Sequence, residues 1–120
     1  MESELQLSES EWQLMKVLWE IAPASVNQIA EITSHWHPKT VRTMLIRLDK
    51  KGVVGFTLDN GIQHYAPKLT REECEAQATE SFLQRVFNGA LTPMVAHFSR
   101  SRKLTVEERE ALLNLLNDKE

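Results

Sequence analysis

The chain has 120 residues, a length that suits one compact domain or a small domain with an appended segment. Hydrophobic residues make up 42% and charged residues 26%, which are globular values and exclude wholesale disorder. The single cysteine, Cys74, excludes an intramolecular disulfide and favours a reducing, cytoplasmic location. The acidic first ten residues lack an apolar signal core, and no run approaches the roughly 20 apolar residues of a membrane span. We therefore expect no membrane insertion.

The charge of the chain is unevenly distributed. Fourteen basic and 17 acidic residues give a net charge of −3, which by itself argues against nucleic-acid binding. Between Trp36 and Gly52, however, the chain has five basic residues and one acidic residue, Asp49, so the net charge of this segment is +4. One basic segment therefore stands out in an acidic chain.

Four capping boxes predict where helices begin, because in each a Ser or Thr is followed three residues later by Glu or Gln. They pair Ser8 with Glu11, Ser25 with Gln28, Thr70 with Glu73, and Thr105 with Glu108. The first helix is predicted over 9–21 and the second over 26–34. Their apolar periodicity predicts that Leu14, Val17, Leu18, Ile21, Ile29, Ala30 and Thr33 point inward.

A third helix is predicted to begin at Pro38, which suits the first helical position, and to end before Gly52. Its apolar stripe is Val41, Met44, Leu45 and Leu48, and its other faces are polar and largely basic. Two short β-prone runs, 53–58 and 62–66, follow and are joined by Asp59-Asn60-Gly61, a strong hairpin signal. The order helix, helix, basic helix, hairpin predicts a mainly α fold with a helix-turn-helix and a β-hairpin wing.

From Thr70 onward the pattern is helical again, which predicts two domains, a winged helix over 1–69 and a helical region over 70–120. About fifty residues in three helices bury their apolar side chains poorly alone, so we expect a second copy of the chain to cover them. The expected homodimer interface consists of Phe82, Val86, Phe87, Leu91, Val95, Phe98, Leu112 and Leu116.

The basic helix is the main functional candidate, because a helix fits the major groove and Lys, Arg and Thr contact phosphates and base edges. The alternative is a solvated charged face on a winged helix that binds protein. A metal-responsive regulator using His35, His37 and Cys74 is a third possibility, although no Cys-x-x-Cys pattern accompanies them. Phosphate-binding loops and nucleophile motifs are missing, so we expect no enzyme, no cofactor and no metal.

The segment 36–52, WHPKTVRTMLIRLDKKG, resembles the recognition-helix signature of the penicillinase repressor (BlaI/MecI/CopY) family. Glu11-Trp12 with Met15 and Trp19 is similar to the first helix of that family, and the apolar pattern over 81–98 is similar to its dimerisation region. The resemblance implies a homodimeric repressor that binds double-stranded DNA at inverted repeats with TACA/TGTA-like half-sites. The residues it implies at the DNA, together with the basic helix end, are Lys39, Thr40, Arg42, Thr43, Arg47, Lys50, Lys51 and Asn60.

Three departures from the family pattern qualify the resemblance. The paired Cys-x-Cys motifs of the copper-responsive branch are missing, which argues against copper sensing by that route. In the β-lactam branch a membrane sensor protease is linked to cleavage at an Asn-Phe bond, and the matching candidate cleavage site here is His97-Phe98. His37 replaces the usual capping Ser, which we expect to weaken the helix start by about 1 kcal/mol or less. The inducing signal stays open.

Overall fold

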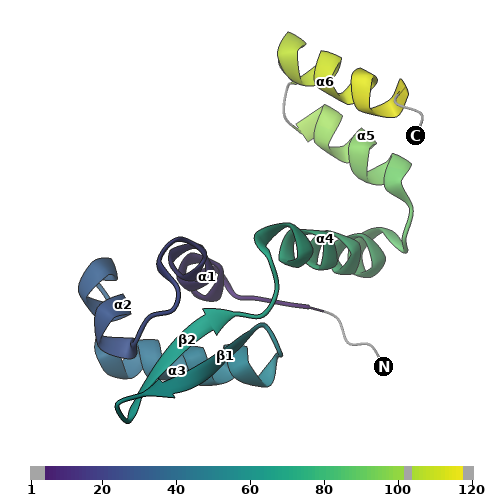
Figure 1. Cartoon of the computed structure of the whole chain (residues 1–120). Helices are drawn as coiled ribbons and strands as arrows, with labels where there is room; N and C mark the ends of the chain where they lie inside the picture. Colours follow the sequence, from purple (N-terminus) through teal and green to yellow (C-terminus); the bar gives the residue numbers. More distant parts are fainter. Residues whose placement is uncertain (1–4, 102–103, 118–120) are drawn as a thin grey trace. The chain divides into compact units, whose positions relative to one another are not determined.

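A computed structural model describes residues 5–101 and 104–117 of the chain. Six helices and a two-stranded hairpin follow one another in these residues (Figure 1). Their bounds are α1 (Glu9–Ile21), α2 (Val26–Thr33), α3 (Pro38–Lys50), β1 (Val54–Asp59), β2 (Ile62–Pro67), α4 (Arg71–Phe87), α5 (Leu91–Ser101) and α6 (Val106–Asn117). The predicted mainly α winged-helix fold is confirmed.

The chain divides into two compact units, and the boundary between them falls in the α4 segment of the chain, between Ser81 and Phe82. We call the part up to Ser81 the N-terminal unit and the part from Phe82 the C-terminal unit. The boundary between them lies later than the position after Leu69 that the sequence suggested. The reason is that the first turns of α4 pack with the N-terminal unit, where the Cys74 side chain is fully buried.

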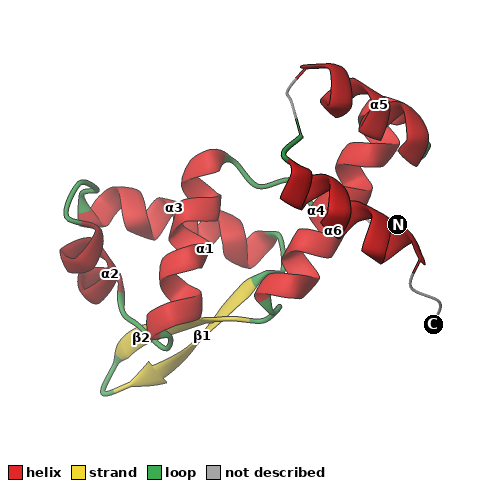
Figure 2. Cartoon of the chain, turned by 90° about the horizontal axis from the view of Figure 1, so that it is seen from above, coloured by secondary structure: helices red, strands yellow, loops and turns green. Residues whose placement is uncertain are grey.

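The N-terminal unit packs α1, α2, α3 and the hairpin around one apolar core (Figure 2). The stripe predicted for α3 is the stripe that the core buries. In α1, Leu14, Met15 and Leu18 are buried together with Glu11, while Val17 and Ile21, predicted to point inward, are only half-buried. Burial of a Val, Leu, Ile or Met side chain contributes about 1.5–3 kcal/mol, so this core is a main source of the unit's stability.

All four predicted capping boxes are present. The Ser8 hydroxyl accepts from the Glu11 backbone N–H at 3.1 Å, and the Glu11 carboxylate accepts from the Ser8 N–H at 2.9 Å. The same reciprocal bonds join Ser25 with Gln28, Thr70 with Glu73, and Thr105 with Glu108. At α3 the His37 ring replaces a hydroxyl, and its Nδ1 accepts from the Lys39 N–H at 3.1 Å. The helix start is thus capped without a serine.

The hairpin has the predicted tight turn. Asp59 pairs with Ile62, and the two residues between them, Asn60 and Gly61, have φ values of 54° and 78°. Positive φ at both central positions is the two-residue turn that matches the twist of antiparallel strands. A third segment joins the sheet, because Ala24 and Tyr65 exchange two backbone hydrogen bonds of 3.0 and 2.8 Å. This bridge fixes the hairpin against the chain between α1 and α2.

The C-terminal unit buries none of the side chains of α5 and α6 within its described residues. Phe82 and Phe87 meet edge to face with ring centroids 6.1 Å apart, and the His97 ring lies 6.5 Å from that of Phe87. Large apolar side chains nevertheless stay open to solvent, from 36% for Phe82 to 72% for Leu116. This unit has the helices of a domain but no enclosed core.

Candidate nucleic-acid interface

Helix α3 presents a polar, cationic face because its apolar stripe anchors the opposite side in the core. With 3.6 residues per turn, the side opposite the stripe is centred on Lys39, Thr43, Ile46 and Lys50. Arg42 lies on one flank of that face, and Arg47 and Thr40 lie on the other. All of these side chains are exposed, as expected from the sequence. The only acidic residue of the helix, Asp49, is half-buried at the edge.

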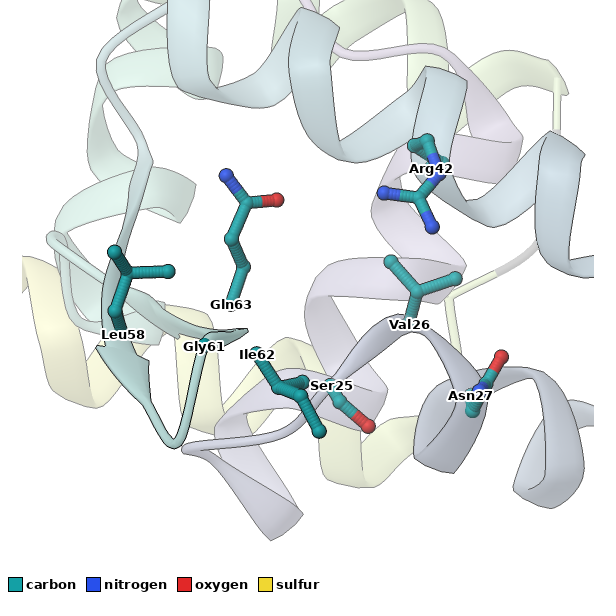
Figure 3. Close-up of a pocket in the computed structure, with 8 residues that line it drawn as sticks. All are labelled: Ser25, Val26, Asn27, Arg42, Leu58, Gly61, Ile62 and Gln63. Carbon is teal, nitrogen blue, oxygen red and sulfur yellow. The ribbon is translucent and has the colours of Figure 1, made fainter.

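The hairpin forms a cleft with α2 and α3 (Figure 3). Its volume is about 470 Å³, and it is lined by Ser25, Val26, Asn27, Arg42, Leu58, Gly61, Ile62 and Gln63. The Arg42 guanidinium from α3 and the Gln63 amide from β2 both point into this space (Figure 3). Donors from a helix start, a neighbouring helix and a strand therefore border one groove, an arrangement suited to a phosphate backbone.

Sequence reasoning missed Ser25, Asn27 and Gln63 as candidates for this surface. The capping box at Ser25 marked the start of α2, where backbone N–H groups favour anions. Nothing in the sequence showed that the hairpin would lie beside that helix start. The missing information was the Ala24–Tyr65 bridge, which joins residues far apart in the chain.

Lys51 is expected at the DNA, but the structure also gives it an intramolecular role. Its Nζ donates to Glu11 Oε1 at 2.8 Å and to the Gln6 carbonyl at 2.7 Å. Burial of Glu11 acts to raise its pKa, but the hydrogen bonds from Lys51 and Ser8 and the charge of Lys51 outweigh burial and hold that pKa below 4.5. The pair joins the start of α1 to the end of α3.

The hairpin residues 54–67 contain no Lys or Arg. Asn60 is exposed at the turn, and Leu58 and Ile62 beside it are 66% and 54% exposed. A hairpin whose only Asp or Glu is Asp59 and which has no Lys or Arg contributes shape, amide groups and apolar contact rather than positive charge. The cationic part of the surface is therefore concentrated on α3.

The three residues considered for a metal site have other contacts. The His37 ring caps α3, the His35 Nδ1 lies 2.5 Å from the Thr33 carbonyl oxygen, and Cys74 is buried in the core. Burial, with the charges of Glu73 and Glu75, raises the pKa of the Cys74 thiol. Within 5–101 and 104–117, no group of three His, Cys, Asp or Glu side chains is placed to hold a metal ion.

A search of the same ranges finds no helix with the length and apolar character that a bilayer span requires. The helix-turn-helix, the exposed cationic face of α3 and the adjoining hairpin define a winged-helix DNA-binding protein.

Comparison with known proteins gives the family. The sequence model of the penicillinase repressor family matches residues 7–118. The chain is 32% identical over 117 residues to the methicillin resistance regulatory protein MecI of Staphylococcus aureus strain N315, a match that covers 95% of each chain. It is 34% identical over 116 residues to the penicillinase repressor of Bacillus licheniformis, covering 94% of this chain and 91% of the relative. The chain belongs to the penicillinase repressor family.

A solved structure supports the same assignment. The DNA-binding domain of the repressor BlaI is 33% identical in sequence and superposes with a TM-score of 0.52. The match covers 61% of this chain and 93% of that domain. The protein is accordingly a DNA-binding transcriptional repressor and not an enzyme.

Proposed function

We propose that the protein represses transcription by occupying an inverted-repeat operator as a homodimer, with α3 of each protomer in a major groove. The observation that carries this proposal is the exposed cationic face of α3 opposite a fully anchored apolar stripe. A helix held in this way enters the groove as a rigid body, so its side chains meet base edges in a fixed register. The residues proposed at the DNA are Lys39, Thr40, Arg42, Thr43, Arg47, Lys50 and Asn60.

Two kinds of contact are combined in this interface. Lys39, Thr43 and Lys50 lie at the centre of the exposed face, where the bases pass. Arg42 lies beside the hairpin, and with Gln63 it borders the groove that suits a phosphate strand. Lys51 acts mainly through Glu11, because its ammonium already donates to that carboxylate. It holds the end of α3 in place and adds its charge to the local field.

The C-terminal unit supplies the proposed dimer contacts. Its exposed apolar side chains include the whole set predicted from the sequence except Phe87, which is half-buried. Pairing of two such units places two copies of α3 on one face of the duplex, about 34 Å apart for half-sites one helical turn apart. Because the two recognition helices are then linked, binding of one half-site favours binding of the other, and the affinity for the whole operator rises.

Release from the operator is proposed to act on the same unit. The peptide between His97 and Phe98 lies within α5, and both side chains are exposed. A sensor protease that cut there would divide the helix carrying Val95 from the segment carrying Leu112. Loss of the dimer would lower operator affinity while leaving every DNA contact intact.

The test is the salt dependence of binding to duplexes selected from a random pool. With about six to ten phosphate contacts per dimer, log affinity should fall against log salt with a slope of about −5 to −9. Arg42→Ala, which removes a proposed phosphate contact, should reduce the number of released ions and thus flatten the slope by about 1 per protomer. Lys16→Ala, which removes an exposed lysine on α1, is the matched control and should leave the slope unchanged. A slope near zero would favour a protein-binding module instead.

A further inference from the structure

An isoleucine stands in the middle of the cationic face. Ile46 is 46% exposed, and it lies on the side of α3 opposite the buried stripe. It contributes nothing to the core, which already contains Val41, Leu45 and Leu48 from the same helix. Single exposed apolar side chains are common on protein surfaces, but this one lies on the face proposed to enter the major groove, where it is placed to contact a base edge.

The polar side chain one turn before Ile46 on the same face has its donor occupied. One turn earlier on the same face, the Thr43 hydroxyl donates to the Lys39 carbonyl at 3.0 Å, so its proton is used within the helix. The cations nearest in sequence, Arg42 and Arg47, lie on the flanks of the face. Lys50 lies one turn later on the same face, so Ile46 is an apolar side chain among cationic neighbours.

The floor of the major groove offers one apolar group, the C5 methyl of thymine. We propose that Ile46 recognises a thymine methyl in each operator half-site and is a specificity-determining residue of this repressor. The inference rests on the proposed function, since it requires α3 to lie in the major groove. The methyl is buried against the isoleucine, whereas cytosine and uracil at the same position leave that side chain facing water.

A protein-docking role fits Ile46 less well. One isoleucine ringed by Lys39, Arg42, Arg47 and Lys50 is far smaller than the contiguous apolar patches that mark protein interfaces. A single methyl group needs only one such side chain. The single apolar side chain fits one thymine methyl group, and the cations around it fit the negative charge of DNA.

The experiment removes the methyl without changing base pairing. Operator duplexes selected from a random pool are prepared with deoxyuridine in place of thymidine, one symmetric pair of positions at a time. Burial of one methyl group corresponds to about a fourfold change in affinity per half-site. For the unaltered protein, one thymine pair should show that loss. For Ile46→Ala, thymine and uracil at that position should bind equally, with weaker binding overall.

Ile32→Ala is the matched control, because Ile32 is also an exposed isoleucine, at 57%, but lies on α2. This variant should keep the full thymine preference of the unaltered protein. The inference is overturned if Ile46→Ala keeps the preference, or if the unaltered protein shows none at any position. In both cases salt-dependent duplex binding persists and the proposed function stands. Loss of all salt-dependent binding in the unaltered protein would instead remove the proposed function itself.

Discussion

The N-terminal and C-terminal units differ in how much of their apolar side chains they bury. The first encloses Leu14, Leu18, Ile29 and Leu45 completely, each with no exposed surface. The second leaves Phe98 at 41% and Leu116 at 72% exposed. Helical periodicity is present in both, so periodicity predicts that a helix forms and not where its apolar face is buried. We therefore expect the C-terminal unit to gain its stability from the proposed dimer.

The largest expected effect comes from separating the two units. A chain ending at Ser81 should unfold cooperatively and keep its helices, because its core is complete. A peptide of residues 82–120 should lose most of its helix content at micromolar concentration, since short helices without tertiary packing are marginal in water. Circular dichroism during thermal unfolding measures both. A stable, monomeric 82–120 peptide would show that this unit needs no partner.

The second expected effect concerns the C-terminal unit alone. Phe98→Asp places a charge where the proposed dimer buries an aromatic ring, and should weaken dimerisation by roughly 3–5 kcal/mol. Thr92→Asp, on the same helix and with the same charge, is the control and should leave the dimer intact. Sedimentation equilibrium gives the association constants. Equal association constants for the two variants would place the interface elsewhere.

The third effect tests the N-terminal unit through the buried carboxylate of Glu11. Glu11→Ala removes a capping partner of Ser8 and leaves the Lys51 ammonium without its ion pair. We expect the free energy of unfolding to fall by about 2–4 kcal/mol. Chemical denaturation of the chain ending at Ser81 is the measurement, and Glu20→Ala, an exposed position on the same helix, is the control.

The same carboxylate predicts a pH dependence. The folded pKa of Glu11 lies below its ordinary value of 4.5, so the stabilisation is complete above that value. It is lost as the pH falls through the lower, folded pKa. Denaturation of the 1–81 chain should therefore show a stability loss on acidification that Glu11→Ala lacks. Parallel pH profiles for the two proteins would contradict this role of Glu11.

The smallest expected effect concerns the start of α3. His37→Ala removes the ring nitrogen that accepts from the Lys39 N–H and should cost about 1 kcal/mol or less. His37→Ser restores an N-cap acceptor and should match or exceed the original stability. The measurement is the midpoint temperature of thermal unfolding for the original protein and the two variants. If the alanine variant were as stable as the serine variant, the cap seen at His37 would contribute nothing.

Local features were predictable from the sequence because their causes are local. The apolar stripe of α3, the four capping boxes and the turn at Asn60 and Gly61 each depend on residues a few positions apart. Features that join distant segments were not predictable. The Glu11–Lys51 pair, the Ala24–Tyr65 bridge and the burial of Cys74 all need the tertiary fold, and no spacing rule marks them.

At the candidate site, too, local features were predictable from the sequence and features that join distant segments were not. The exposed cations of α3 followed from the helical period alone. The cleft beside Arg42 did not, because it exists only where the hairpin meets the start of α2. Ile46 was visible in the sequence on a polar face, but its exposed fraction was needed to separate a ligand contact from a core residue.

The uneven charge of the chain has a consequence for how a repressor searches a genome. Residues 36–52 carry +4 while the whole chain carries −3, so the remaining residues carry −7. DNA therefore repels most orientations of the molecule and attracts the one in which α3 leads. Collisions in other orientations separate quickly, so encounters that last are those in which the recognition helix faces the duplex. The acidic body thus orients the repressor on DNA without touching the operator.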